Sequence, residues 1–207
     1  MMKITSISQQ KNDPSRVSIF VNEKVFAGLS NVSFSKLDLH QDDILSEEKI
    51  KLIEIQSELD GAIDFVIKSC VRARQTTQTI HEKLIKKDYA EPVILQAIAK
   101  GKELNLIDDS EFIRLFIKDK TNLKNWGAKR IKAELVKKGI PGEQIDEELE
   151  KSTEVQPDLD EVKRLVKKKF SPLTNQDNHQ KAVKFLQYRG FSWDEIKSLL
   201  SQVEEED

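Results

Sequence analysis

A gapless repeat of 51 residues constrains this chain more than any other feature of its sequence. Four apolar positions each occur three times at this offset (135 − 84 and 186 − 135). They are Leu84, Leu135 and Leu186; Tyr89, Ile140 and Phe191; Ile94, Ile145 and Ile196; and Ile98, Leu149 and Leu200. Because a period of this length is typical of stacked supersecondary units, we expect one structural unit to be built three times.

Each repeat reads as helices joined by a short turn. In the second repeat, Ile131 and Leu135 lie four residues apart, which places them on one face of a helix. Gly139 and Gly190 stand a few residues later in the second and third repeats, and Asp88 stands there in the first. Glycine adopts a left-handed conformation without steric cost, and aspartate tolerates it. We therefore expect a helix to end at this position in every repeat.

A third amphipathic helix precedes each pair, so each repeat is predicted to contain three helices in about 50 residues. A unit this small buries little apolar surface alone, and neighbouring units are expected to stack into an elongated, curved array. The expected repeats are residues 58–108, 109–157 and 158–207. The predicted fold class is mainly α, with three tandem three-helix repeats.

The N-terminal residues 1–57 follow a different pattern. Two β-branched and aromatic runs, residues 17–21 and 25–29, flank a three-residue polar connector, which indicates a β-hairpin. Ser46 precedes two glutamates, a pattern that favours the start of a capped helix. Because an isolated hairpin is only marginally stable in water, it must pack on something else. We expect a small N-terminal β-hairpin plus helix.

Composition and motifs point away from membranes and from catalysis. No stretch approaches the roughly 18 consecutive apolar residues of a spanning helix. The single cysteine, Cys70, excludes an internal disulfide, which fits a reducing compartment. We therefore expect the protein to lie in the cytoplasm. We also expect it to be a monomer. His40, His81 and His179 lack metal-ligand spacing, and none of the seven glycines lies in a phosphate-binding motif. We predict that the chain is not an enzyme and binds no metal or cofactor.

The formal net charge of -2 hides alternating acidic and basic blocks. Residues 38–60 hold eight acids and two bases, whereas residues 109–140 hold nine bases and four acids. Residues 163–189 are basic again. One interpretation is that each helix shows solvent a face of mixed sign. The alternative is that basic helices lie in register and form a surface for a polyanion or an acidic protein groove.

Four segments resemble motifs of the RecX family. Residues 127–140, GAKRIKAELVKKGI, resemble its central signature G-x-x-R-[IL]-x-x-E-L-x-x-K-G-I. Residues 106–112 are similar to the start of its second repeat, residues 72–74 to its R-x-R-S loop and residues 189–192 to its third-repeat RGFS. Gln75 departs from the pattern, because the family has a serine there that would cap the next helix.

The resemblance implies a regulator of the RecA recombinase that lodges in the groove of the RecA–DNA filament. It would modulate, and mostly inhibit, the recombinase, ATPase and coprotease activities of RecA in DNA repair and the SOS response. We place the partner surface on basic residues of all three repeats. They are Arg72, Arg74, Lys129, Arg130, Lys132, Lys137, Lys138, Lys167, Lys168 and Lys169. Two alternatives stay open: sequence-independent binding of single- or double-stranded DNA, and a helical scaffold for an unrelated protein.

Overall fold

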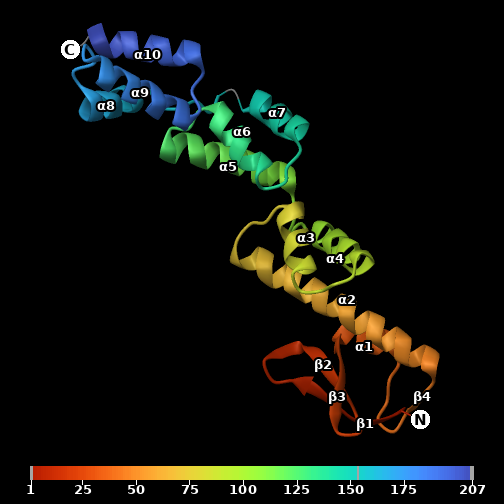
Figure 1. The fold of residues 1–207 in the computed structure, drawn as a ribbon. Coiled ribbons are helices and arrows are strands. Elements are labelled where there is room, and N and C mark those ends of the chain that lie inside the picture. Colours follow the sequence, from red (N-terminus) through yellow and green to blue (C-terminus); the bar gives the residue numbers. More distant parts are fainter. Residues whose placement is uncertain (1, 153, 206–207) are drawn as a thin grey trace. The chain divides into compact units, whose positions relative to one another are not determined.

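The computed structural model describes residues 2–152 and 154–205 (Figure 1). The chain divides into two compact units between Ile107 and Asp108. The first unit holds a β-sheet and the first helical repeat, and the second unit holds the second and third repeats. Most of the described residues are helical, which confirms the predicted fold class.

A four-stranded sheet with the order β3-β2-β1-β4 opens the first unit, and all its neighbouring strands are antiparallel. The strands are β1 (Met2–Gln10), β2 (Asp13–Val21), β3 (Lys24–Ser30) and β4 (Ile44–Leu45). The predicted hairpin is confirmed as β2 and β3, and the sheet is larger than this hairpin because β1 and β4 join it. Sequence patterns do not reveal β1, because Ile4 is its only buried residue.

The turn between β2 and β3 explains how a polar connector without glycine closes the hairpin. Asn22 and Glu23 have φ angles of 51° and 62°, so both central residues are left-handed, as a type I′ turn requires. On β2, the alternate residues Val17, Ile19 and Val21 are buried. The register of the hairpin therefore turns one apolar face of the sheet towards the core.

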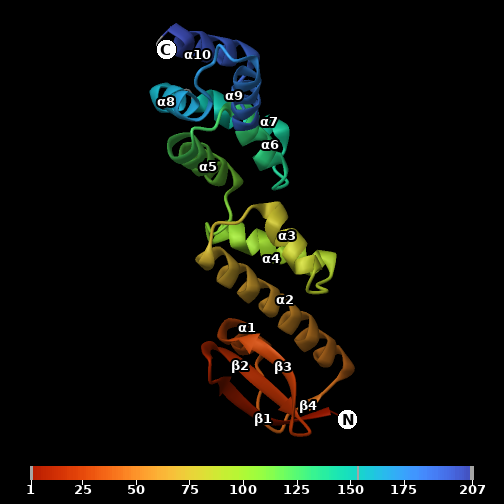
Figure 2. The ribbon, with the colours of Figure 1, turned by 60° about the vertical axis from the view of Figure 1, so that its left-hand side comes forward.

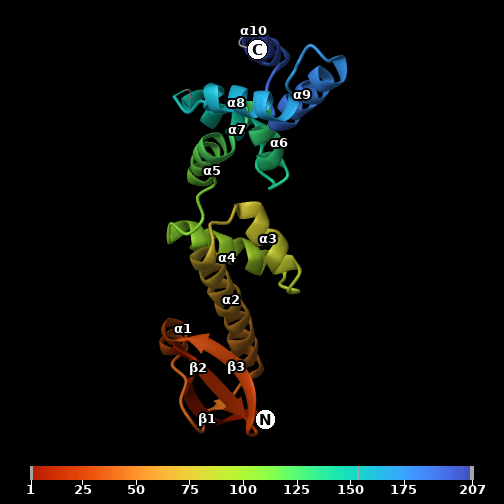
Figure 3. The same cartoon turned by 90° about the vertical axis from the view of Figure 1, so that its left-hand side faces the viewer.

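Helix α2 (Glu47–Arg72) connects the sheet to the first repeat (Figure 3). Its start is as predicted, because the Ser46 side chain accepts a hydrogen bond from the Lys49 backbone N–H. Ile53 packs in the core of the sheet, whereas Val66 packs in the core of the first repeat. One continuous helix therefore contributes side chains to both hydrophobic cores. It runs without a break through residue 57, where the sequence analysis ends the N-terminal segment. Helix α1 (Asn31–Leu37) packs on β2, β3 and α2 (Figure 2).

The remaining helices follow the repeat. They are α3 (Thr77–Ile85) and α4 (Glu91–Glu103) in the first repeat, α5 (Asp109–Lys124), α6 (Ala128–Val136) and α7 (Gly142–Lys151) in the second, and α8 (Leu159–Phe170), α9 (Gln176–Arg189) and α10 (Trp193–Glu205) in the third. The leucines of the first anchor set, Leu84, Leu135 and Leu186, are each fully buried. Residues that are 51 positions apart in this set therefore occupy equivalent positions in the cores of the three repeats.

The predicted turn positions are confirmed. Asp88, Gly139 and Gly190 have φ angles of 61°, 76° and 88°, so each lies in the left-handed region. The absence of a serine at Gln75 does not leave helix α3 without a cap, because the Thr76 side chain accepts a hydrogen bond from the Thr79 N–H. The capping residue lies one position later than the family motif suggests.

Candidate interaction surface

The second and third repeats contact each other backbone to backbone, where α6 begins and α9 ends. The Gly127 N–H donates a hydrogen bond of 2.8 Å to the Arg189 carbonyl oxygen. A Cβ atom on Gly127 would lie 2.5 Å from the Gly190 carbonyl oxygen, and one on Gly190 would lie 2.3 Å from the Arg130 backbone nitrogen. Both distances are too short for any side chain. Glycine at both positions therefore allows the two helix ends to meet, and we call this contact the α6–α9 joint.

Arg130 fills the α6–α9 joint with its side chain. Its guanidinium carbon lies 4.0 Å from the ring centroid of Trp126 and 3.9 Å from that of Tyr188. The Nη1 atom also donates a hydrogen bond of 2.9 Å to the Tyr188 carbonyl oxygen. A planar guanidinium stacks on aromatic faces and donates in its own plane at the same time, which a lysine does not do. Arg130, which the sequence places on the partner surface, makes these contacts within the chain itself.

A second arginine, Arg189, lies at the same joint, although it is not among the predicted site residues. It donates a hydrogen bond of 2.7 Å to the Lys124 carbonyl oxygen, and its guanidinium carbon is 4.6 Å from the Phe185 ring centroid. Burial, and after it the charge of Arg130, lowers the pKa of Arg189. Two arginines and three aromatic rings thus line one hollow on the second unit. The sequence signal for Arg189 was its place directly before the left-handed Gly190.

The other predicted cations of the second repeat lie on α6 or just after it. Lys132 bonds both carboxylate oxygens of Asp146 at 2.6 Å, and Lys137 bonds Glu134 at 3.0 Å. Lys129 is exposed and has no polar partner among the described residues. An exposed ion pair contributes little to stability, so these lysines stay available to a partner at low cost.

The Lys138 ammonium lies 5.8 Å from the Phe112 ring centroid. The predicted cations of the third repeat, Lys167, Lys168 and Lys169, form the last turn of α8, where positive charge is favoured by the helix dipole. Lys168 and Lys169 are exposed, and the Lys169 ammonium is 5.0 Å from the Phe185 ring centroid. These lysines therefore combine a local structural role with accessible charge.

The two predicted arginines of the first repeat belong to the other unit. Arg72 is the last residue of α2, Arg74 follows in the loop before α3, and both are exposed. The predicted surface is consequently divided between the two compact units. Within the second unit, only Arg130 among the predicted residues takes part in the α6–α9 joint.

One member of the acidic block at residues 38–60 also has a structural role. Asp60 is buried, and its carboxylate accepts hydrogen bonds from the Ser30 N–H at 2.6 Å, the Ser33 hydroxyl at 2.9 Å and the Gln56 amide at 3.0 Å. These bonds join the end of β3 and the start of α1 to α2. Asp60 is therefore a fixed anchor and is not part of a solvated acidic face.

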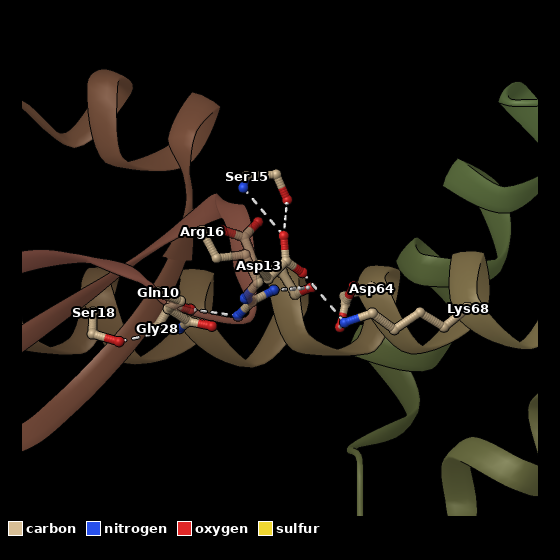
Figure 4. Close-up of polar contacts among 9 residues, drawn as sticks. Gln10, Asp13, Ser15, Arg16, Ser18, Gly28, Asp64 and Lys68 are labelled. Carbon is tan, nitrogen blue, oxygen red and sulfur yellow. Dashed lines mark hydrogen bonds and ion pairs between the residues drawn. The ribbon is translucent and has the colours of Figure 1, made fainter.

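Arg16 strengthens the same contact between the sheet and α2. It donates hydrogen bonds to the carbonyl oxygens of Asp60, at 3.0 Å, and Gly28, at 2.8 Å. Figure 4 shows Arg16 with Gly28, and beside them Lys68, which pairs with Asp64 at 2.7 Å and Asp13 at 3.3 Å. The hydrogen bond that the Lys68 ammonium donates to the Asp64 carboxylate is the main reason that the pKa of Lys68 is raised.

Three further observations concern metal binding, membrane insertion and cysteine chemistry. Within residues 2–152 and 154–205, no group of three or more histidine, cysteine or acidic side chains could hold a metal ion. No helix in this part of the chain is long and apolar enough to cross a membrane. Burial raises the pKa of the half-buried Cys70 thiol, which is the opposite of what a nucleophilic cysteine needs.

Three family models match the chain over most of its length. "Regulatory protein RecX N-terminal domain" matches residues 2–46, "RecX, second three-helix domain" matches residues 108–149, and "RecX, third three-helix domain" matches residues 156–200. The matches to the second and third domains cover most of the second and third repeats.

Curated relatives and solved structures agree with these matches. The protein "Regulatory protein RecX" of Clostridium botulinum (strain Eklund 17B / Type B) is 30% identical over 98% of this chain and 96% of its own length. That of Clostridioides difficile (strain 630) is 30% identical over 97% and 95%. "Crystal structure of regulatory protein RecX" matches with a TM-score of 0.75 and 24% identity over 98% of this chain and 100% of that one. "Crystal structure of RecX from Lactobacillus salivarius" matches with a TM-score of 0.62 and 22% identity, over 72% of this chain and 97% of that one.

Proposed function

From the premise that this chain belongs to the RecX family of regulatory proteins, we propose that it binds the RecA recombinase on DNA and mostly inhibits it. The observation that carries this proposal is the likeness to proteins named regulatory protein RecX over nearly the full length of the chain. The activities affected would be strand exchange, ATP hydrolysis and coprotease function, in DNA repair and the SOS response. The site of action would be the cytoplasm, with the chain acting as a monomer.

We assign the contact with the recombinase filament to the exposed basic residues of the predicted set. Lys129 on α6 and Lys168 on α8 are the clearest candidates, because both are exposed and neither has a carboxylate partner among the described residues. Arg130 would act indirectly, because its own contacts hold the second and third repeats together. Several weak contacts on successive repeats add affinity without any strong single contact.

The test is inhibition of RecA-driven strand exchange by the variant Lys129→Glu/Lys168→Glu. We expect this variant to keep its helicity and to need a higher concentration than the unmodified protein for half-inhibition, because charge reversal replaces attraction by repulsion. The matched control is Lys24→Glu/Lys51→Glu, which makes the same charge change at two exposed lysines of the first unit. Equal inhibition by both variants would overturn the assignment of the surface.

Inhibition by the unmodified protein is the test of the function itself. If the unmodified protein neither inhibits nor stimulates RecA at any concentration, and no RecA is retained by it from a cell extract, the proposed function is wrong. Arg130 is left intact in these experiments, because a change there would alter the α6–α9 joint as well as the charge.

A further inference from the structure

A hollow of about 390 Å³ lies in the first unit, where the sheet meets the helices α1, α2 and α4. Arg16 of β2 lines one side of it (Figure 4), and the end of β3 and the three helices supply most of the other lining residues. None of these residues belongs to the basic set that is assigned to the recombinase. We call this feature the α1–α2 hollow, because Val32 and Lys36 of α1 and Ile63 and Ile67 of α2 line it.

Most polar side chains of the α1–α2 hollow already have partners within the chain. The Asp60 carboxylate accepts three hydrogen bonds. Asp64 pairs with Lys68, and Lys100 pairs with Glu103, both at 2.7 Å. A ligand could bind to these groups only by breaking bonds that the fold already makes, so they contribute little to its recognition.

Lys36 differs from these groups. It is exposed, and within residues 2–152 and 154–205 no hydrogen bond or ion pair holds its ammonium. Val32 lies four residues earlier on α1, so the two side chains project from the same face of the helix. Val32 is 64% exposed although it is apolar. Helix α1 therefore presents an apolar side chain and a free cation to the hollow.

Helix α2 supplies an apolar wall. Ile63 and Ile67 lie four residues apart on this helix, and both are half-buried. Ile63 also packs against the core of the first repeat, which holds the wall in place. An apolar group placed between Val32 and these isoleucines would remove apolar surface from water on more than one side, which favours binding.

The ligand that fits these groups has an apolar part with a negative charge beside it. Sites for free small molecules enclose most of the ligand surface, whereas the exposed Val32 and Lys36 leave the α1–α2 hollow open to solvent. None of the described residues that line it is aromatic, so a nucleic acid base would find no ring on which to stack. Protein interfaces commonly place a side chain of one partner in a pocket of the other. We propose that the α1–α2 hollow takes an apolar side chain of a partner protein, whose neighbouring carboxylate pairs with Lys36.

The test is an NMR titration of the full chain, labelled at its isoleucine and valine methyl groups, with the peptide acetyl-Gly-Leu-Asp-Gly-amide. We expect the methyl signals of Val32, Ile63 and Ile67 to shift in a saturable way. Lys36→Gln should weaken the binding about two- to fivefold, which is the range of an exposed ion pair. The same substitution at Lys24, an exposed lysine of the first unit outside the hollow, should leave the binding unchanged.

A second peptide separates the ion pair from any general effect of the substitution. With asparagine in place of aspartate, the peptide should bind the unmodified protein as weakly as the aspartate peptide binds the Lys36→Gln variant. Lys36→Gln should weaken binding of the asparagine peptide no further, because the two changes remove the same contact. Val32→Thr, which replaces a methyl group by a hydroxyl group, should weaken binding of both peptides.

Four results would overturn the proposal. They are no saturable shift with the aspartate peptide, equal effects of Lys36→Gln on the two peptides, an equal effect of Lys24→Gln, or binding of hexanoate as tight as that of the aspartate peptide. The last result would assign the hollow to a free apolar acid. The proposal does not rest on the proposed function, and the assay contains no recombinase, so each can fail without the other.

Discussion

Gly190 lies so close to Arg130 that a Cβ atom added to it would be 2.3 Å from the Arg130 backbone nitrogen. The contact brings the left-handed end of α9 onto the first turn of α6, and the Gly127 N–H bonds the Arg189 carbonyl oxygen beside it. The two repeats of the second unit are therefore joined by backbone packing that only glycine permits. This relationship makes the joint sensitive to single substitutions.

Gly190→Ala should destabilise the second unit. A left-handed φ of 88° costs an alanine about 1–2 kcal/mol, and the clash with Arg130 adds to this. The measurement is urea unfolding followed by circular dichroism. The control is Gly142→Ala, because a Cβ there would meet only the end of the Lys132 side chain at 3.9 Å and alanine favours a helix. Equal stability of the two variants would contradict the account of the joint.

Arg130→Lys should weaken the same joint although it keeps the charge. Lysine cannot stack on both Trp126 and Tyr188 while it donates to a carbonyl group, so we expect the free energy of unfolding to fall by about 1–2 kcal/mol. The same substitution at Arg114, which is exposed on α5, is the control and should have almost no effect. If the free energy of unfolding fell equally in both variants, the aromatic contacts of Arg130 would contribute nothing to stability.

Asp60→Asn should loosen the contact between the sheet and α2. All three groups that bond the Asp60 carboxylate are donors, and an asparagine would turn its own donor towards one of them. A buried donor left without an acceptor costs about 1–3 kcal/mol. Glu54→Gln, at an exposed position on the same helix, serves as the control in the same unfolding measurement. A stable Asp60→Asn variant would mean that the carboxylate is not an anchor.

Cys70 should react slowly with alkylating agents in the folded protein. Burial raises the pKa of the thiol, so the pH at which alkylation becomes fast should be higher in the native protein than in urea. A raised pKa favours folding below the ordinary thiol pKa, and this contribution is lost as the pH rises through the raised value. Since the chain has a single cysteine, the Cys70→Ser variant reports the background. The same pH dependence in native protein and in urea would contradict the prediction.

Much of the helical architecture was readable from the chain. The 51-residue offset identified core positions such as Leu84 and Leu135, because a helix places its apolar residues at a local and regular spacing. The turn residues Asp88, Gly139 and Gly190 were readable for the same reason, since the conformation of one residue decides which side chains it tolerates.

The size of the sheet was not readable. Strand β1 has three apolar residues, Met2, Ile4 and Ile7, of which only Ile4 is buried. The strand is held by hydrogen bonds to β2 and β4. Nothing in the local pattern of a strand identifies its partners. The same holds for α2, because its sequence does not reveal that one helix packs against the cores of both the sheet and the first repeat.

The sequence by itself determined the repeat, the helices and the family resemblance, because these depend on spacing and residue type along the chain. The tertiary structure decided what each charge does. Arg130 turned out to stack between Trp126 and Tyr188, and Asp60 proved to be buried, whereas Lys129 stayed exposed. The reason is physical: the role of a charged side chain depends on which distant groups lie within a few ångströms of it, and only folding brings those groups together.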